Sequence, residues 1–279
     1  MWFNKRGLNF RTSIKKLEEN YITDLGFTPR LYNYDAVNNV TVREGYLQTS
    51  SGVEYEKFYE KSKTINSVRF LNYGANNYFD DNGTLTQSKH FLNSVVFFKN
   101  LSAIYYVIDY DHINLKYGFD PLGNGNALTP GKYNFGVLKV GYNSANNQKF
   151  RYRVSMKRGD FYTGKQTGAG LYLNHQLLPF ANLEVNYDVS AIDLNELGSD
   201  TFHLSRFTGQ VFLNNRLNWT TYVQYNTQRD NFNVNSRLQW GYKPLSYVYL
   251  VVTDNYNTEQ SFNRTNLGIA CKINYRLDF

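Results

Sequence analysis

The sequence contains no run of about 20 consecutive apolar residues, the length that a transmembrane helix needs. Its single cysteine, Cys271, excludes an intramolecular disulfide. The 5 prolines in 279 residues are fewer than the Gly- and Pro-rich turns of a β-sandwich would supply. The histidines lack the spacing of metal ligands; they are His90, His112, His175 and His203. These features argue against a helical membrane protein and a histidine-ligated metal site.

Two abundant kinds of residue indicate a different class of protein. Aromatic residues make up 17% of the chain, with 25 tyrosines and 20 phenylalanines, and they suit strand faces and the interfacial girdles of membrane barrels. The net charge is +7, which suits nucleic acid, an anionic membrane surface or an acidic ligand. Lysine and arginine are dispersed and form no basic helix or arm, so nucleic-acid binding is not predicted.

The last stretch of the chain, residues 266–279, alternates between apolar and polar positions without interruption. The apolar positions are Leu267, Ile269, Cys271, Ile273, Tyr275, Leu277 and Phe279. A period of two indicates a strand with one apolar face, on which Cys271 is a small hydrophobic residue and not a nucleophile. A strand of a transmembrane barrel has this pattern. We therefore predict that Tyr275, Leu277 and Phe279 form the membrane-insertion signal.

Similar strands precede this one and form a predicted meander. Alternation is found at residues 150–157, 183–190, 217–226 and 232–243, and residues 247–253 form a strand with two apolar faces. In the first hundred residues we predict strands at 37–49, 52–59, 64–78 and 87–98, and residues 7–17 suit a strand better than the alternative of a short helix. Because no helix intervenes, consecutive strands are expected to pair as antiparallel hairpins.

The predicted connections alternate in length. Short ones fall at residues 99–100, 143–147, 178–181, 214–215 and 243–246. Long ones fall at residues 112–131, 158–165, 191–200, 228–231 and 254–265. Bacterial outer-membrane barrels have short periplasmic turns and longer extracellular loops, so the alternation predicts which end of the sheet faces the cell exterior.

We therefore predict an all-β fold, an antiparallel up-and-down transmembrane β-barrel of about 14 to 16 strands in the cell outer membrane. Residues 1–279 are expected to form one barrel domain. A count near 15 is odd where closed bacterial barrels are even, and residues 1–20 lack the pattern of a signal peptide. A signal peptide, a binding domain and the first strands are expected to precede this sequence, as the C-terminal part of a larger barrel.

A soluble β-sandwich is the alternative fold, since its strands also alternate. The alternating strands here are about ten residues long, which is the length of a tilted membrane strand. Their polar faces carry charges of both signs. Both features favour the barrel.

Two groups of acidic residues are candidate sites for chemistry. Asp109 and Asp111 share a strand face beside His112, but two carboxylates supply only part of the oxygen set of a hard cation. Glu54, Glu56 and Glu60 share a face in the manner of a polar stripe, which is a simpler explanation than a pair of glycosidase carboxylates. No order of Ser, His and Asp and no nucleophile elbow is present. We predict no catalytic, cofactor or metal site.

The predicted lumen carries basic residues on one strand and acidic residues two strands away. The proposed network consists of Arg151, Arg153, Lys157, Glu184 and Asp188. Opposite charges in a confined space attract one another more strongly than in bulk water. We expect these residues to restrict free diffusion through the lumen.

From residue 26 onward the chain resembles the C-terminal barrel of a bacterial outer-membrane family. Full members of that family carry a signal peptide and an N-terminal carbohydrate-binding domain like that of family nine. The matching segments are 26–30 (GFTPR), 159–164 (GDFYTG), 223–226 (VQYN), 236–240 (SRLQW), 242–244 (YKP) and 249–252 (YLVV). The chain departs from the family at Leu245, where the family has glycine in a Pro-Gly-Ser turn. The resemblance implies the barrel architecture but assigns sugar binding to no residue of this sequence.

The predicted function is that of a non-enzymatic outer-membrane barrel, an anchor or a conduit linked to glycan binding or uptake. One alternative is a membrane protein associated with a carbohydrate-active hydrolase, whose carboxylates would have to converge. The other is a soluble β-rich binding module. The expected partners are outer-membrane lipid, the barrel-insertion machinery and glycans, without nucleic acid or cofactor.

Overall fold

The computed structural model describes residues 2–5, 7–23, 28 and 30–277. The first strands are β1 (Trp2–Lys5), β2 (Leu8–Leu17), β3 (Tyr32–Asp35), β4 (Val40–Arg43), β5 (Tyr46–Phe58), β6 (Ile65–Phe79), β7 (Leu85–Phe98), β8 (Ala103–Leu115) and β9 (Gly131–Asn143). They are followed by β10 (Phe150–Phe161), β11 (Gly164–Leu177), β12 (Ala181–Asp193), β13 (Ser199–Phe212), β14 (Leu217–Asn226), β15 (Asn231–Lys243), β16 (Ser246–Asn257) and β17 (Asn263–Asn274). A short 3-10 helix, η1 (Asn195–Leu197), joins β12 to β13.

Fifteen of these strands follow one another in a single sheet order, β1-β2-β5-β6 and then consecutively to β17, and β3 and β4 form a separate hairpin. The all-β, antiparallel up-and-down meander predicted from the sequence is thereby confirmed, as is the predicted number of strands. β1 and β17 are the two ends of the order. In the part of the chain that the structure describes, no helix has the length and apolar character needed to cross a membrane.

The chain has two compact units. The first unit comprises Met1–Tyr142, Met156–Thr167 and Ala191–Asp200, and the second comprises Asn143–Ser155, Gly168–Ser190 and Thr201–Phe279. Each unit is described on its own below.

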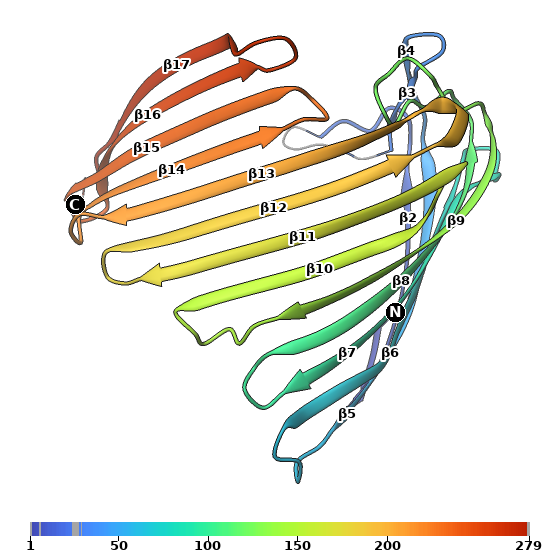
Figure 1. The fold of residues 1–279 in the computed structure, drawn as a ribbon, viewed down its shortest axis with the longest axis horizontal. Helices are drawn as coiled ribbons and strands as arrows, with labels where there is room; N and C mark the ends of the chain where they lie inside the picture. Colours follow the sequence, from blue (N-terminus) through green and yellow to red (C-terminus); the bar gives the residue numbers. More distant parts are fainter. Residues whose placement is uncertain (1, 6, 24–27, 29, 278–279) are drawn as a thin grey trace. The chain divides into compact units, whose positions relative to one another are not determined.

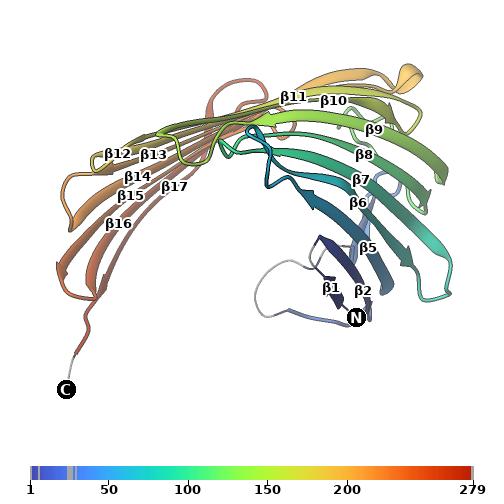
Figure 2. The ribbon, with the colours of Figure 1, turned by 90° about the horizontal axis from the view of Figure 1, so that it is seen from below.

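The strands of the second unit separate apolar from polar side chains. β14 to β17 lie side by side in both views of the ribbon (Figure 1 and Figure 2). The register aligns Trp219, Leu238, Leu250 and Cys271 in one row and Leu217, Trp240, Val248 and Ile273 in another. We call these two rows the apolar face of the second unit. Period-two alternation places a polar row between them, in which Asn218, Gln239, Tyr249 and Lys272 are aligned.

The apolar face of the second unit is exposed. The exposed fraction is 50% for both Trp219 and Trp240, 42% for Leu250 and 67% for Ile273. A sheet that formed one half of a sandwich would bury these side chains against a second sheet. The described residues do not cover this face.

The strands of the first unit also have one polar face. The register pairs Tyr78 with Gln87 and Lys89 with Asp111, and the ammonium of Lys89 lies 3.8 Å from the carboxylate of Asp109. We call the face that carries these five residues the polar face of the first unit. The opposite face of β8 exposes Ile104, Tyr106, Ile108 and Tyr110.

The predicted strand at residues 37–49 is wrong. Residues 32–43 instead form the hairpin of β3 and β4. β5 begins at Tyr46 and runs to Phe58, so it takes in most of the segment 52–59, which is predicted above to be a separate strand. The Asp35 carboxylate accepts hydrogen bonds from the backbone N–H groups of Val37 and Asn38, at 3.0 and 3.4 Å, and Asn39 has a φ of 53°. These are the features of an Asx turn, which the apolar residues on both sides conceal.

The predicted long connection at residues 158–165 is also wrong. β10 continues to Phe161 and β11 begins at Gly164, which leaves only Tyr162 and Thr163 between them. Tyr162 has a φ of 50°, and a Cβ atom at Gly164 would lie 1.8 Å from the carbonyl oxygen of Asp193. Only glycine permits this approach.

The other connections follow the predictions more closely. The long connection after β8 spans residues 116–130, and the turns between β7 and β8, β13 and β14, and β15 and β16 span 99–102, 213–216 and 244–245. The predicted links 191–200 and 254–265 shorten to 194–198 and 258–262, because their flanking strands extend further than the alternation indicated.

Candidate functional site

The connections at one end of the first unit pack together into one structure. Antiparallel strands alternate in direction, so the connections after β2, β6, β8, β10 and β12 all lie at the same end of the sheet. They comprise residues 18–23, 28, 30–45, 80–84, 116–130, 162–163 and 194–198. We call this structure the cap.

The cap contains the most buried apolar side chains of the described chain. Leu31, Leu128 and Leu194 are each 1% exposed. Leu31 packs in a cluster with Leu17 and Tyr46. Because burial of such a side chain stabilises a fold by about 1.5–3 kcal/mol, the cap has a small hydrophobic core of its own.

The β3–β4 hairpin is attached to the connection after β8. The backbone N–H of Ala36 donates to the carbonyl of Gly118 at 2.9 Å. A Cβ atom at Gly118 would lie 2.5 Å from a methyl group of Val37. Glycine therefore allows the two backbones to approach this closely.

Two asparagines connect the later parts of the cap. The side-chain amide of Asn124 donates to the carbonyl of Leu197 at 2.9 Å. The side-chain amide of Asn195 donates to the carbonyl of Thr163 at 2.6 Å. The connections after β8, β10 and β12 are thus joined by hydrogen bonds between side chains and backbone.

Arg30, just before β3, lies against the polar face of the first unit. Its guanidinium carbon lies 3.7 Å from the centre of the Tyr78 ring, a distance at which a cation is attracted by the ring. The guanidinium also donates to the side-chain carbonyl of Gln87. Gln87 in turn donates its amide to Asp111 at 2.7 Å. Arg30 thereby contacts β6 and β7 on the face that carries their charged residues.

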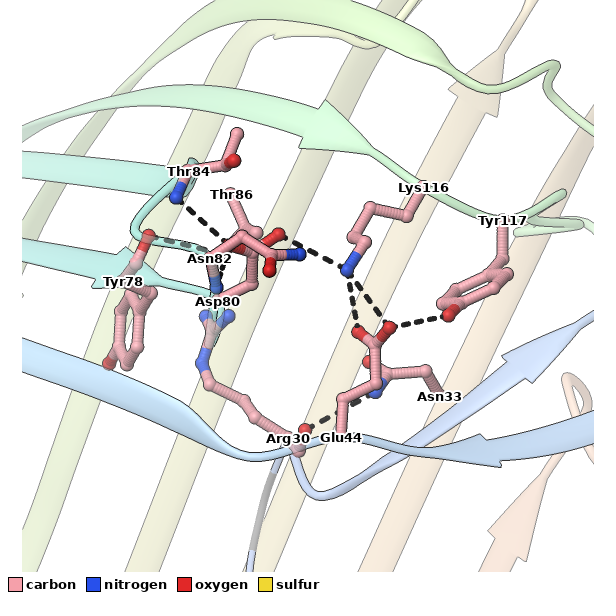
Figure 3. A network of polar contacts seen from close by, with 10 residues as sticks. All are labelled: Arg30, Asn33, Glu44, Tyr78, Asp80, Asn82, Thr84, Thr86, Lys116 and Tyr117. Atoms are coloured by element: carbon pink, nitrogen blue, oxygen red, sulfur yellow. Dashed lines mark hydrogen bonds and ion pairs between the residues drawn. The ribbon is translucent and has the colours of Figure 1, made fainter. Parts of the chain in front are cut away.

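Lys116 is the centre of a second polar contact (Figure 3). Its ammonium lies 2.9 and 3.1 Å from the two carboxylate oxygens of Glu44, which precedes β5. It also lies 3.3 Å from the carboxylate of Asp80, in the connection after β6. The Tyr117 hydroxyl donates to Glu44 at 2.6 Å. Lys116 therefore joins three connections that are distant in the sequence.

The surroundings of Lys116 stabilise its charge and that of Asp80. Burial acts to raise the pKa of Asp80, but hydrogen bonds from the Thr84 N–H and from Lys116 outweigh it and lower this pKa below its ordinary 3.8. Burial acts to lower the pKa of Lys116, but its hydrogen bonds to Glu44 and Asp80 raise this pKa above 10.5. Both groups are therefore charged at neutral pH.

A pocket of about 430 Å³ lies beside these contacts in the first unit. Arg30, Tyr32, Glu44, Lys116 and Phe119 are among the residues that line it. Its volume is within the range of about 300–1,000 Å³ that small-molecule sites occupy. One of its lining residues, Glu44, accepts hydrogen bonds from Lys116 and Tyr117.

Tyr162 forms the aromatic side of this region. Its ring centre lies 5.6 Å from that of Phe119, 5.3 Å from that of Tyr133 and 4.9 Å from that of Phe135. Burial, reinforced by the nearby charge of Asp111, raises the pKa of Tyr162 to about 12. The aromatic group packs the β10–β11 turn onto the start of β9 and the connection that precedes it.

The predicted lumenal network contains indirect contacts in place of direct ion pairs. The Arg153 guanidinium lies 3.9 Å from the centre of the Tyr172 ring, and the Tyr172 hydroxyl donates to Glu184 at 3.1 Å. Tyr172 therefore lies between Arg153 and Glu184. The opposite charges of Arg153 and Glu184 share a face of the sheet, and the side chain of Tyr172 bridges them.

The other members of that network bind further residues. Arg151 donates to the side-chain oxygen of Asn174 at 2.7 Å, and Asn174 is 1% exposed. The partner of Asp188 is Arg206, at 3.3 Å. Lys157 donates to Gln166 at 3.1 Å. Whether these residues restrict diffusion stays a prediction.

Four of the acidic residues considered in the sequence are paired with cations. Asp109 and Asp111 lie 3.8 and 4.0 Å from Lys89, and His112 contacts Asn134 at 2.6 Å. Arg69 lies 3.4 Å from Glu54 and 3.2 Å from Glu56, whereas Glu60 follows β5 in the next connection. Within the described ranges, no three His, Cys, Asp or Glu side chains are placed to hold a metal ion.

The residues of the predicted insertion signal lie at the end of the second unit. Tyr275 is 53% exposed and Leu277 is 64% exposed, while Phe279 lies outside the described residues. Cys271 is exposed and belongs to the apolar face of the second unit, as the alternation predicted.

The cap was missed in the sequence because its contacts join distant positions. In the sequence, Glu44 falls in the predicted strand 37–49, Asp80 between the predicted strands 64–78 and 87–98, and Lys116 in the predicted connection 112–131. The available signal was the length of the connection after β8, since connections longer than about 12–15 residues are often functional.

Comparison with protein-family models gives no match to the chain. Searches of curated proteins and of solved structures also give no match. The resemblance to the outer-membrane barrel family therefore stays a prediction from the residues that carry it.

Proposed function

We propose that this chain is an integral outer-membrane β-barrel protein, a non-enzymatic anchor or conduit. The observation that carries the proposal is the apolar face of the second unit, whose rows are continuous across β14 to β17 and exposed. Barrel strands in the outer membrane are apolar toward lipid and polar toward the lumen.

The energetics of that face favour lipid over water. Leaving a large apolar side chain in water costs about 1.5–3 kcal/mol relative to burial. Exposed contiguous patches of apolar side chains on soluble monomers are rarely larger than a few hundred Å². Contact with lipid removes this cost along the whole face without a second protein layer.

The polar side chains support a lumen on the other face. Arg153, Tyr172 and Glu184 form a contact chain across three neighbouring strands. In a conduit, such a network restricts the passage of solutes. Neutralising its ends in Arg153→Gln and Glu184→Gln should raise the conductance of the protein in planar bilayers; unchanged conductance would remove the network from the proposal.

The resemblance to a family that carries a carbohydrate-binding domain suggests the system that this barrel serves. We propose that it anchors, or provides passage for, a glycan-binding or uptake system. This part of the proposal depends on the resemblance and not on the pocket.

Tryptophan quenching tests the membrane assignment. Trp219 and Trp240 both lie on the apolar face of the second unit, so Trp2→Phe leaves only these two indoles in the chain. Refolded into vesicles, this variant should lose most of its fluorescence when the lipid tails are brominated. A monodisperse, water-soluble monomer whose fluorescence ignores brominated lipid would contradict the proposal.

A further inference from the structure

One residue of the cap, Arg30, lies on the polar face of the first unit. Arg30 stacks on Tyr78 and binds Gln87, and these two residues are register partners on β6 and β7. An extracellular loop that projected away from the sheet would not contact side chains of this face. Arg30 therefore lies over this face where β6 ends and β7 begins, at the rim of the surface that would line a lumen.

Apolar packing fixes one part of this segment. Leu31 is 1% exposed among Leu17 and Tyr46, and Tyr78 packs against the same cluster. The rings of Tyr46 and Tyr78 meet edge to face with centres 6.0 Å apart. This cluster holds Leu31 at the cap end of β2, β5 and β6.

Lys116 fixes the other part. Glu44 ends the segment, and Lys116 connects it to Asp80 from the β6–β7 connection (Figure 3). The side chain of Lys116 is 32% exposed, that of Glu44 27% and that of Asp80 11%. Ion pairs that are partly shielded from water are screened less by salt than fully exposed ones.

We propose that the cap is a constriction of the conduit and that Lys116 is the positioning residue that holds it closed. This inference rests on the proposed function, since it requires a lumen along the polar face of the first unit. Lys116 touches no solute in this role. It acts by keeping residues 30–45 against β6 and β7.

The first experiment measures how tightly the cap is held to the strands. It is done in detergent, where the result does not depend on a conduit. Lys116→Gln should increase proteinase K cleavage within residues 36–43 by about tenfold, because it removes a hydrogen-bonded charge. Lys116→Arg keeps the charge and should restore slow cleavage. Lys63→Gln makes the same substitution at an exposed lysine in the β5–β6 connection, at the other end of the strands, and should have no effect.

The second experiment measures single-channel conductance of the same variants in planar bilayers. Lys116→Gln should raise conductance by about twofold or more, since a pore is limited by its narrowest part. Lys116→Arg and Lys63→Gln should match the unsubstituted protein. Should Lys116→Gln fail to fold, Glu44→Gln weakens the same contact while leaving the Lys116 to Asp80 pair in place.

The two readouts separate the possible failures. Faster cleavage with unchanged conductance would overturn the constriction and leave the conduit standing. Unchanged cleavage would overturn the role of Lys116. A protein that inserts in lipid without conducting would be an anchor, which also overturns the constriction, while failure to insert would refute the proposed function itself.

Discussion

The cap of the first unit and the strands β14 to β17 of the second unit distribute their apolar side chains in opposite ways. In the cap, Leu31 is 1% exposed, although it belongs to a connection. On β16, Leu250 is 42% exposed, although it lies in the middle of a strand. In soluble proteins strands supply the core and connections run over the surface. This reversal is the one expected if lipid contacts the strands, as we propose.

The largest expected effect compares these two leucines by the same substitution. Leu31→Ala should lower the free energy of unfolding by about 2–5 kcal/mol, because it leaves a cavity in a packed cluster. Leu250→Ala leaves no packed cavity and should lower it by only about 1 kcal/mol, the contact of the removed, half-exposed methyl groups with detergent instead of water. Denaturant unfolding in detergent measures both. Equal losses would show that the two regions are not packed differently.

A charge placed on β16 or β17 distinguishes the two faces of the second unit. Leu250→Arg should destabilise the protein in vesicles by about 2–4 kcal/mol, the cost of arginine at the bilayer midplane on the lipid side of a barrel. Ala270→Arg, on the opposite face of β17, is the matched control and should cost much less. Refolding yield in vesicles measures the difference, and equal yields for both variants would argue against a lipid-facing side.

The stability of the cap should depend on pH through Asp80 and Lys116. The pKa of Asp80 is lowered by folding, so its stabilisation is present above pH 3.8 and is lost as the pH falls below that value. The pKa of Lys116 is raised, so its stabilisation is present below pH 10.5 and is lost at higher pH.

Asp80→Asn should therefore destabilise the protein by about 1 kcal/mol at pH 7, through loss of hydrogen bonds to a charged group. Its Tm should approach that of the unsubstituted protein as the pH falls below 3.8. Thermal melts across this range test the sign. A difference in Tm that does not change with pH would mean that the charge of Asp80 is unimportant.

The smallest expected effect concerns Tyr162. Burial raises its pKa to about 12, so its phenol should stay protonated under conditions that ionise exposed tyrosines. The Tyr162→Phe variant and the unsubstituted protein can be titrated side by side while tyrosinate absorbance is recorded. The absorbance that the variant lacks should appear in the unsubstituted protein only well above pH 10. A missing signal near pH 10 would place Tyr162 in solvent.

The strands were predictable from the sequence because successive side chains of a strand alternate between two faces with different surroundings. Ile269, Cys271 and Ile273 alternate with polar residues, and each side chain is set by the face on which it lies. The alternation is a local signal that needs no knowledge of the strand partners. It gave the meander, the number of strands and the two faces of β14 to β17.

The cap was not predictable in the same way. Glu44 and Lys116 are 72 positions apart, and neither belongs to a periodic pattern that would indicate a contact. Around the β3–β4 turn, Val37, Val40 and Val42 mimic a strand, so the Asx turn at Asp35 was hidden. Contacts that depend on three-dimensional proximity of irregular segments leave little trace in one sequence.

Spin-label accessibility along β16 tests the central claim most directly. In a Cys271→Ser background, labels placed singly at residues 248–253 would report collisions with oxygen, which concentrates in lipid, and with a water-soluble nickel chelate. We predict high oxygen accessibility at 248, 250 and 252 and low accessibility at 249, 251 and 253. A profile without this alternation, or nickel accessibility at 248, 250 and 252, would contradict the assignment of the apolar face to lipid.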